Sequence, residues 1–352
     1  MNKKVEKLKK WKDGGRASPY VMDINPTDLC NLSCKSCWQR SEEFGDFDGS
    51  YELTDKKLRE VVDQGIEMGI DKFRITGGGE PFMRKDIVLE LMERIKNAGK
   101  VGTITTNGTL LDEEDLDLIM DINWDIITFS IDGPNKETND RLRGEGSFSA
   151  IKSSLQYLMK SEREGPEVKF NTVISKKNYD KLIEIIELAN EFEVEYVSFE
   201  TMTVHSDTGE KIKLSEEGKK EVVREIPEVK KKAEEYGIGT NVQGLKKKYF
   251  DKTNDMTEVL LGKEIGDFTN VACYEPWYHL VLKVDGSAQP CCLYDAKEEN
   301  VKKKSLEEIW FGDFFQGIRK NIKKGNFSNY CEICNASQVM ANEELSEKLQ
   351  KL

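Results

Sequence analysis

The 352-residue sequence predicts an α/β fold, in which a partial barrel of strand–helix units precedes a small C-terminal domain. Between about residues 20 and 205, short β-rich runs alternate with longer segments of helical periodicity. This alternation is typical of a parallel sheet with right-handed crossovers. The stretch is shorter than the ~250 residues of a full eight-unit barrel. We therefore expect a partial (β/α)6 TIM-like barrel.

Six segments are predicted as the strands of this barrel. Between them, apolar residues recur at helical spacing, as in the segment after Thr54 that places Leu58, Val61 and Val62 on one face. The predicted strands are Val21–Ile24, Lys72–Thr76, Gly102–Thr106, Ile126–Ile131, Val168–Ile174 and Tyr196–Glu200.

The rest of the chain divides by composition. A Lys- and Glu-rich stretch reads as helical over Leu214–Tyr236, and a hairpin is expected around the Asp285-Gly286 turn. A helix is predicted over Ser305–Lys320, with Ser305 and Glu308 as a capping box. The expected divisions are an N-terminal extension (1–19), the barrel (20–205), a helical linker or cap (206–269), a second domain (270–340) and a charged helical tail (341–352).

Composition excludes several classes of protein. The net charge of −12 argues against a nucleic-acid-binding protein, which usually has a basic footprint. The sequence contains no run of about 18 apolar residues, so no membrane span is expected. It has no apolar segment near its start, so no secretory signal is expected. We expect a cytoplasmic protein, with the basic residues among the first 16 forming a solvated helix or arm.

The eight cysteines fall into two groups near the ends of the sequence, and only two histidines are present. In a reducing compartment, clustered cysteines bind metal more often than they form disulfides. The first group, Cys30-x3-Cys34-x2-Cys37, follows the first predicted strand. This position is the carboxyl edge of a parallel sheet, where such folds carry their active sites.

Three thiolates can hold three irons of a [4Fe–4S] cluster and leave the fourth iron open. The amino and carboxylate groups of S-adenosylmethionine (SAM) suit that open position. An electron passed through the cluster could then break the sulfonium bond and release a 5′-deoxyadenosyl radical. A zinc site is the alternative, but zinc requires four ligands and no histidine lies near these cysteines.

In this spacing and in several later motifs, residues 20–205 resemble the radical SAM superfamily. Gly78-Gly79-Glu80-Pro81 matches the family's GGE motif, which implies binding of the SAM amino group. The resemblance also implies SAM contacts at Asn107, Ser130, Asp132, Asn171 and Val173. Each motif alone could be an ordinary turn or cap, and their order along the strands is what favours the family. One departure is Ser36, where relatives often carry an aromatic residue, while Trp38 follows Cys37.

The second group offers four thiolates, which suit either structural zinc or an iron–sulfur cluster. They are Cys273, Cys291, Cys331 and Cys334. Their surroundings, about residues 270–336, resemble the SPASM/twitch domains of radical SAM enzymes. Because the full SPASM form needs about seven cysteines, the resemblance implies the twitch form with one auxiliary [4Fe–4S] cluster. The cysteine spacing is similar to that of 2-deoxy-scyllo-inosamine dehydrogenase.

Cys292 is left over from both groups. It could be a structural thiol, a substitute ligand or a hydrogen-atom donor to a substrate radical. A substrate radical that loses an electron to the auxiliary cluster is oxidised, whereas one that receives a hydrogen atom from Cys292 is epimerised.

The predicted function is therefore dehydrogenation or epimerisation of a small polar substrate, such as a sugar or aminocyclitol. A flavodoxin- or ferredoxin-type protein is the expected electron donor. The preference for a small substrate comes from the 29 residues before Cys30, too few for the N-terminal domain of many peptide-modifying relatives. A peptide-modifying (RiPP-type) maturase is the alternative, and a non-catalytic iron–sulfur or zinc protein is the remote one.

Overall fold

The computed structural model describes residues 2–37, 39, 48–162, 164–204, 206–250, 267–294, 296–331 and 336–352. Within these ranges, no helix has the length and apolar character needed to cross a bilayer.

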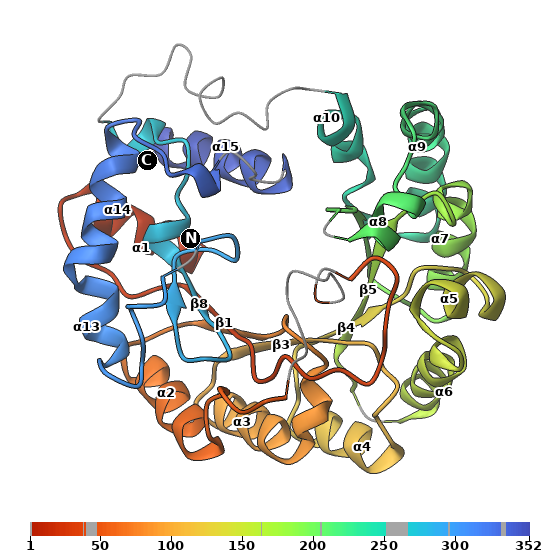
Figure 1. Cartoon of the computed structure of the whole chain (residues 1–352), viewed down its shortest axis with the longest axis horizontal. Helices are drawn as coiled ribbons and strands as arrows, with labels where there is room; N and C mark the ends of the chain where they lie inside the picture. The colour runs from red at the N-terminus through yellow and green to blue at the C-terminus, as the bar shows by residue number, and fades with distance from the viewer. Residues whose placement is uncertain are drawn as a thin grey trace.

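One nine-stranded sheet forms the frame, in the order β7-β6-β5-β4-β3-β2-β1-β8-β9. All neighbours are parallel except β8 and β9. In Figure 1 the sheet curves so that the strands line the inside of a ring and the helices cover the outside. The strands are β1 (Val21–Ile24), β2 (Lys72–Ile75), β3 (Val101–Thr106), β4 (Ile126–Ser130), β5 (Glu167–Ile174), β6 (Tyr196–Thr201), β7 (Gly239–Thr240), β8 (His279–Leu282) and β9 (Ala288–Gln289).

The helices follow the strands in a regular order. Those of the barrel are α2 (Asp55–Glu67), α3 (Lys85–Asn97), α4 (Glu113–Asp121), α5 (Lys136–Arg143), α6 (Ser147–Lys160), α7 (Leu182–Glu191), α8 (Asp207–Ile212), α9 (Glu216–Tyr236) and α10 (Leu245–Phe250). The terminal regions contribute α1 (Lys3–Lys12), α12 (Glu275–Tyr278), α13 (Leu306–Phe311), α14 (Asp313–Lys323) and α15 (Ala336–Gln350). Short 3-10 turns lie at Pro81–Arg84 (η3), Tyr179–Lys181 (η4), Val242–Gly244 (η5), Phe268–Asn270 (η6) and Asn329–Cys331 (η7).

The hydrophobic core lies between the sheet and the outer helices. On β5, Phe170 and Ile174 are buried in one cluster with Leu91 of α3 and Ile186 of α7. Because side chains alternate along a strand, the intervening residues of β5 face the inside of the barrel, its lumen. Those lumen-facing positions are only partly buried. Burying each large apolar side chain contributes about 1.5–3 kcal/mol.

The six predicted strands are confirmed, with bounds that differ by at most one residue. Three further strands extend the same sheet. β7 comes from the predicted linker, and β8 of the predicted hairpin pairs in parallel with β1, so that Val21 lies opposite His279. The predicted 305–320 helix is two helices, which meet at Gly312; the capping box of Ser305 and Glu308 is confirmed. Part of the linker, residues 251–266, lies outside the described residues.

The N-terminal basic segment is the helix α1, but one of its faces is not solvated. Val5 and Leu8 are buried in a second cluster that also contains Leu345 and Leu349 of α15. The ammonium of Lys12 donates to the carbonyl of Leu349 at 3.2 Å. The two ends of the chain therefore lie side by side, as Figure 1 shows.

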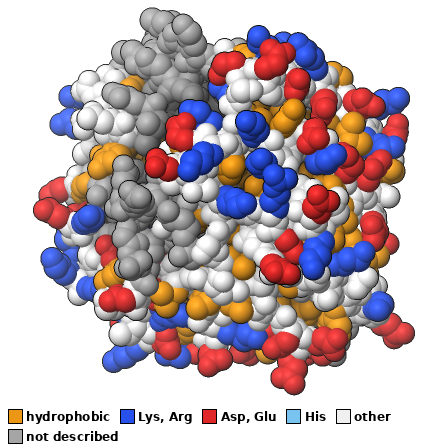
Figure 2. Space-filling model, turned by 45° about the vertical axis from the view of Figure 1, so that its right-hand side comes forward, with side chains coloured by type: hydrophobic (Ala, Val, Ile, Leu, Met, Phe, Trp, Pro, Cys, Tyr) orange, Lys and Arg blue, Asp and Glu red, His pale blue; other side chains and the backbone are white. Residues whose placement is uncertain are grey.

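The outer surface carries charges of both signs. Figure 2 shows Lys and Arg side chains interspersed with Asp and Glu over one face. On α9 such residues pair along the helix, as Lys230 does with Glu234 at 3.5 Å. Exposed pairs of this kind add at most about 1 kcal/mol each, so they favour solubility more than stability.

Candidate active site

The first cysteine loop is held in place by the loop that follows β2. The backbone N–H of Gly79 donates to the carbonyl of Thr27 at 2.8 Å, and that of Glu80 donates to the carbonyl of Leu29 at 2.8 Å. A Cβ at position 79 would lie only 1.8 Å from the Leu29 oxygen. Gly78 has φ +63°, where glycine is favoured. These glycines are therefore required for the two loops to approach each other.

The three thiols of this loop are partly buried and close together. The thiol of Cys34 donates to the carbonyl of Arg143 at 3.6 Å. Burial raises the pKa of Cys34 to about 11, although the positive charge of Arg143 opposes the rise; the charges of Asp132, Cys37 and Cys30 add to it. Among the described residues, no three Cys, His, Asp or Glu side chains surround a single metal ion. The predicted cluster does not require three side chains around a single ion, since each cysteine would bind a different iron.

Glu80 is buried, with 2% of its surface exposed. Its carboxylate accepts hydrogen bonds from the Thr106 hydroxyl at 2.7 Å, from the Asn107 N–H at 2.7 Å and from the Phe82 N–H at 3.2 Å. Burial raises the pKa of Glu80, and these hydrogen bonds oppose the rise. A carboxylate has about four acceptor positions, so one remains for the predicted contact with an ammonium group.

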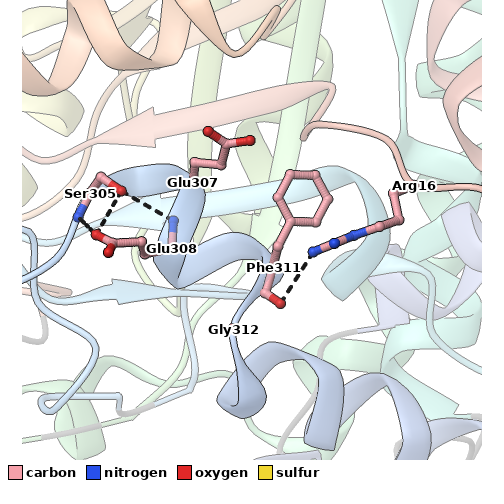
Figure 3. Close-up of a pocket in the computed structure, with 6 residues that line it drawn as sticks. All are labelled: Arg16, Ser305, Glu307, Glu308, Phe311 and Gly312. Atoms are coloured by element: carbon pink, nitrogen blue, oxygen red, sulfur yellow. Dashed lines mark hydrogen bonds between the residues drawn. The ribbon is translucent and has the colours of Figure 1, made fainter.

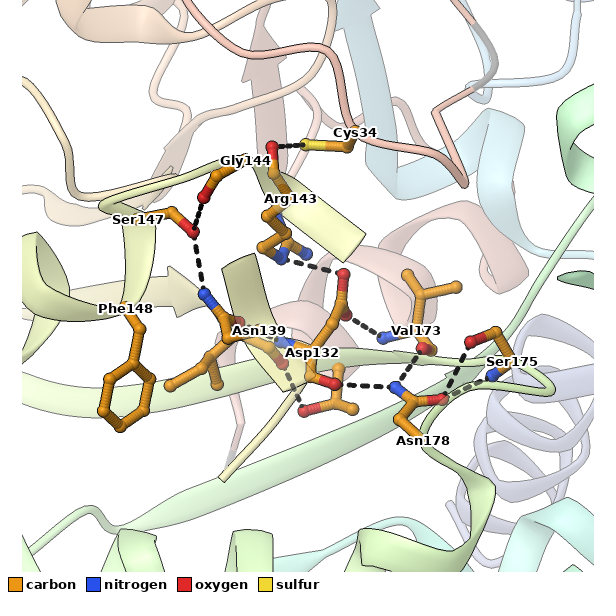
Figure 4. A network of polar contacts seen from close by, with 12 residues as sticks. Cys34, Asp132, Asn139, Arg143, Gly144, Ser147, Phe148, Val173, Ser175 and Asn178 are labelled. Carbon is orange, nitrogen blue, oxygen red and sulfur yellow. Dashed lines mark hydrogen bonds and ion pairs between the residues drawn. The ribbon is translucent and has the colours of Figure 1, made fainter. Parts of the chain in front are cut away.

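A buried polar network supports the cysteine loop from the other side (Figure 4). One Asp132 oxygen lies 2.8 Å from Nε of Arg143, and the other accepts from the Val173 N–H at 2.8 Å. Asn139 and Asn178 bond the backbone of Asp132, each at 2.8 Å. The structure thus gives Asp132 a positioning role; its contact with SAM stays a prediction. Sequence reasoning missed Arg143, Asn139 and Asn178, which belong to no recognisable motif.

The lumen side of the neighbouring strands carries polar side chains that are only partly buried. None of these side chains has a hydrogen bond to any residue that the structure describes. They are Thr103 and Thr105 of β3, Thr128 and Ser130 of β4, and Asn171 of β5. By contrast, Thr106 and Thr172, on the opposite face of the sheet, are buried and bonded. Such uncommitted polar groups are expected of a ligand site, and two of them, Ser130 and Asn171, are predicted SAM contacts.

The other predicted SAM contacts adjoin this site. Asn107 donates to the side chain of Asn31 at 2.9 Å and lies 4.0 Å from the Cys30 sulfur. Val173 contributes its N–H to Asp132. Trp38 lies outside the described residues.

The second cysteine group lines a cavity of about 160 Å³ in the C-terminal region. Cys273, Cys291 and Cys331 contribute to its wall, together with Tyr294 and Ser328. The Ser328 hydroxyl lies 3.6 Å from the Cys331 sulfur. Burial raises the pKa of Cys291 to about 12. The structure therefore brings three of the four predicted ligands to one space; the fourth, Cys334, lies outside the described residues.

Cys292 is separate from this cavity. Its side chain is exposed, whereas Cys291 beside it is partly buried and lines the cavity. Surrounding protein raises the pKa of Cys292, and the carboxylates of Asp23 and Glu275 raise it further. The role of Cys292 as a structural thiol, a substitute ligand or a hydrogen-atom donor stays a prediction.

A buried chain of ionisable side chains runs from the barrel strands to the second cysteine site. The guanidinium of Arg74 on β2 binds both oxygens of Asp23 on β1, and Nε2 of His279 on β8 lies 3.1 Å from Asp23. The other ring nitrogen of His279 contacts Glu275, which lines the cysteine cavity. Burial lowers the pKa of His279, but the charges of Asp23 and Glu275 outweigh it and raise the pKa to about 9. Sequence reasoning noted only that histidines were few and gave His279 no role.

A larger cavity, of about 540 Å³, is a groove away from both cysteine groups (Figure 3). Arg16 crosses it, stacked 4.2 Å from the ring of Phe311. The capping box of Ser305 and Glu308 forms one wall. None of the predicted site residues lies in this groove.

Comparison with known families decides the assignment. The Radical SAM superfamily profile matches residues 24–189, and the SPASM profile, described as an iron-sulfur cluster-binding domain, matches residues 273–335. The chain belongs to the radical SAM superfamily, in its SPASM/twitch subgroup. Its cofactors are accordingly SAM and [4Fe–4S] clusters. The residues at both sites fit these groups, because three thiols accompany the GGE loop and three more line one cavity.

Several curated radical SAM proteins are similar in sequence. Fe-coproporphyrin III synthase of Methanosarcina barkeri is 31% identical over 226 residues, 63% of this chain and 54% of that protein. GTP 3′,8-cyclase of Aquifex aeolicus is 32% identical over 174 residues, 49% of this chain and 52% of that protein. Mycofactocin maturase MftC of Mycobacterium tuberculosis is 31% identical over 193 residues, 54% of this chain and 47% of that protein. The matches span about half the length of these relatives.

Solved structures confirm the predicted fold class. SuiB of Streptococcus suis bound to S-adenosylmethionine has a TM-score of 0.66 at 18% identity, over 93% of this chain and 74% of that chain. Native anSMEcpe with bound AdoMet has a TM-score of 0.62 at 16% identity, over 95% of this chain and 97% of that chain. At these identities the likeness concerns the fold alone.

Proposed function

We propose that this radical SAM enzyme oxidises or epimerises a carbon centre of a small polar substrate bound in the barrel lumen. When bound, the three-cysteine cluster and SAM supply hydrogen-atom abstraction from carbon. One observation carries the proposal: the loop of Cys30, Cys34 and Cys37 is locked against the GGE loop, beside a lumen lined with uncommitted polar side chains. This arrangement supports a reacting site inside the barrel.

The residues around the first cluster have distinct parts in this proposal. Cys30, Cys34 and Cys37 hold the cluster, and the buried carboxylate of Glu80 orients the SAM amino group. The backbone at Gly78 and Gly79 lets SAM approach closely. Further contacts come from Asn107, Ser130, Asp132, Asn171 and Val173. Strands of the barrel hold these groups in place, which favours a defined position for the reacting carbon.

The second site determines the fate of the substrate radical. Cys273, Cys291, Cys331 and Cys334 hold the auxiliary cluster, and with four thiolates no iron is left open for substrate. It serves as an electron acceptor or relay, so that loss of a proton and an electron completes an oxidation. If Cys292 instead donates a hydrogen atom from the opposite face, the product is an epimer, and the sulfur radical left on Cys292 would be reduced by an electron relayed through the auxiliary cluster and a proton from solvent.

The substrate and partners are part of the proposal. A sugar or aminocyclitol was expected from the sequence, but the names of the sequence relatives point to haem-type compounds and GTP. A peptide substrate is the second candidate, because mycofactocin maturase MftC is among these relatives. A flavodoxin- or ferredoxin-type protein is the proposed electron donor. A cytoplasmic location is also part of the proposal, because clustered cysteines that bind metal are typical of a reducing compartment.

Metal analysis and SAM cleavage test the proposal together. Anaerobically reconstituted protein should contain about eight irons, falling to about four in a variant with alanine at Cys30, Cys34 and Cys37. The wild type should form 5′-deoxyadenosine with dithionite, and Cys34→Ala should not. If the wild type forms none, the remaining reading is a non-catalytic iron–sulfur or zinc protein.

Product analysis then separates the two outcomes. In deuterated water, stable deuterium in the product indicates epimerisation by an exchangeable thiol, and Cys292→Ala should abolish its incorporation. An unsaturated or ketone product without deuterium indicates oxidation. Cys292→Ser provides a similar volume without a thiol and should behave as Cys292→Ala does.

A further inference from the structure

We infer that the substrate carries an anionic oxygen group, a carboxylate or a phosphate, and that Lys72 binds this group inside the barrel. The inference rests on the proposed function only in taking the lumen as the substrate site. It concerns a residue outside the SAM motifs and the cysteine groups.

Strand alternation directs Lys72 into the lumen. On β2, Phe73 and Ile75 are fully buried in the core beneath the outer helices. Lys72 and Arg74 therefore face the opposite side. Arg74 confirms this direction, because its guanidinium binds Asp23 of β1 and lies 3.1 Å from His279 of β8. Lys72 lies beside them at the start of the same strand.

Lys72 differs from the other charged side chains of this face in lacking a partner. Arg74 pairs with Asp23, and Lys169 of β5 pairs with Glu167 at 3.0 Å. The ammonium of Lys72 makes no hydrogen bond or ion pair with any residue in the described part of the chain. The side chain is nevertheless partly buried. A desolvated, unpaired charge is unfavourable, so an anionic ligand would supply the missing partner.

The surroundings of Lys72 favour an anion over a cation. Burial lowers the pKa of Lys72, and the positive charges of Arg74 and Lys169 lower it further, while the carboxylates of Asp23 and Glu167 oppose this change. Because those two carboxylates are bonded to Arg74 and Lys169, the charge of Lys72 is left for an anionic ligand. Thr103 of β3 lies in register with Arg74 and offers an uncommitted hydroxyl as a donor. An aminocyclitol, which is positively charged, would be repelled from this end of the lumen.

Binding measurements on the reconstituted holoenzyme test the inference. Equilibrium dialysis would use two anionic probes, Fe-coproporphyrin III for carboxylates and GTP for phosphates, with an aminocyclitol as the cationic probe. We expect wild type to bind one anionic probe and not the cationic one. Lys72→Met should weaken that binding about 10- to 100-fold, the range of a lost charge-assisted hydrogen bond. Lys72→Arg should retain most of it.

A matched control is Lys56→Met on the outer helix α2, where 86% of the lysine side chain is exposed. This variant should bind as wild type does. Iron content equal to wild type would show that Lys72→Met is folded. The inference is overturned if wild type binds neither anion, or if Lys72→Met binds as tightly as Lys56→Met.

The two proposals can fail separately. Absence of 5′-deoxyadenosine from wild type with dithionite would remove the proposed function, whatever the dialysis shows. Formation of 5′-deoxyadenosine by wild type, with anion binding that does not depend on residue 72, would remove only the inference about Lys72.

Discussion

The guanidinium of Arg143 and the carboxylate of Asp132 form a buried ion pair, 2.8 Å apart, beside the first cysteine group. The backbone carbonyl of Arg143 also accepts a hydrogen bond from the Cys34 thiol. Asp132 in turn fixes the end of β5 through the N–H of Val173. The ion pair holds Arg143 in place, and the backbone of Arg143 in turn contacts the cysteine loop, although both residues lie about 100 positions away in the sequence.

Replacing one partner of this pair should loosen the loop. Asp132→Asn leaves the Arg143 charge buried without its counter-ion, which costs about 3–5 kcal/mol. We expect a lower free energy of unfolding in urea and faster loss of iron from the first cluster. The exposed pair of Lys220 and Glu217 provides the control, because Lys220→Met should change stability by less than about 1 kcal/mol. Equal effects of the two variants would contradict the buried-pair argument.

Gly79→Ala should displace the cysteine loop. The added Cβ would lie 1.8 Å from the Leu29 oxygen, so one of the two loop backbones must move. We expect the variant to lose about four irons, those of the first cluster, and to lose SAM cleavage, while circular dichroism shows a retained fold. Gly317→Ala on α14 meets no atom within 4 Å and should be neutral or more stable by up to about 1 kcal/mol. Full iron content in Gly79→Ala would refute the steric explanation.

Much of this site could be predicted because its chemistry depends on short motifs. The spacing of Cys30, Cys34 and Cys37 predicts their grouping, and the GGE motif predicts a close approach of backbone to ligand. The role of Arg143 could not be predicted, because a buried arginine and an exposed one look alike in a sequence. Its partner Asp132 was predicted only as a contact of SAM and not as the counter-ion of an arginine.

Sequence patterns also could not predict that β7, β8 and β9 join the sheet formed by the six predicted strands. The parallel pairing of β8 with β1 joins residues about 260 positions apart, as in Val21 with His279, and no local periodicity encodes such a contact. The two residues of β7 are too few for an alternating pattern. Gly312 divides the predicted helix because its φ of −73° is combined with an extended ψ of 172°, which ends α13.

His279 should make stability decrease at alkaline pH. Its pKa in the folded protein is raised to about 9, against 6.5 ordinarily, because Asp23 and Glu275 outweigh the effect of burial. A raised pKa stabilises the fold fully below pH 6.5, and this contribution is lost as the pH rises through 9. The loss should be on the order of 3 kcal/mol.

Urea unfolding of reconstituted wild type and His279→Gln at several pH values would measure this contribution. Subtracting the variant's profile removes the titration of thiols and lysines elsewhere in the chain. The difference between the two proteins should be largest near pH 6 and should disappear above pH 9. A difference that stays constant between pH 6 and 10 would show that His279 is neutral in the folded protein.

Arg319 should stabilise the auxiliary site in a way that lysine cannot replace. It is 3% exposed, and it donates to the carbonyls of Pro276 and Trp310, each at 2.8 Å. The rings of Trp11 and Trp310 lie 4.7 and 4.4 Å from its guanidinium. Burial and the charge of Arg16 lower its pKa to about 9. A lysine in this position would lose the planar stacking and the two fixed donors, and its lower intrinsic pKa would favour the neutral form.

Arg319→Lys should therefore lower the free energy of unfolding by about 2–4 kcal/mol, from two hydrogen bonds of a charged donor. Because Pro276 lines the cysteine cavity, the variant should also lose iron from the auxiliary cluster before the first cluster. Iron analysis after mild chelation, with electron paramagnetic resonance of the two clusters, would measure this order. Arg16→Lys, which alters a stacking contact at the surface groove, should retain all of its iron. Equal loss from both clusters in Arg319→Lys would indicate general destabilisation instead of a specific support of the auxiliary site.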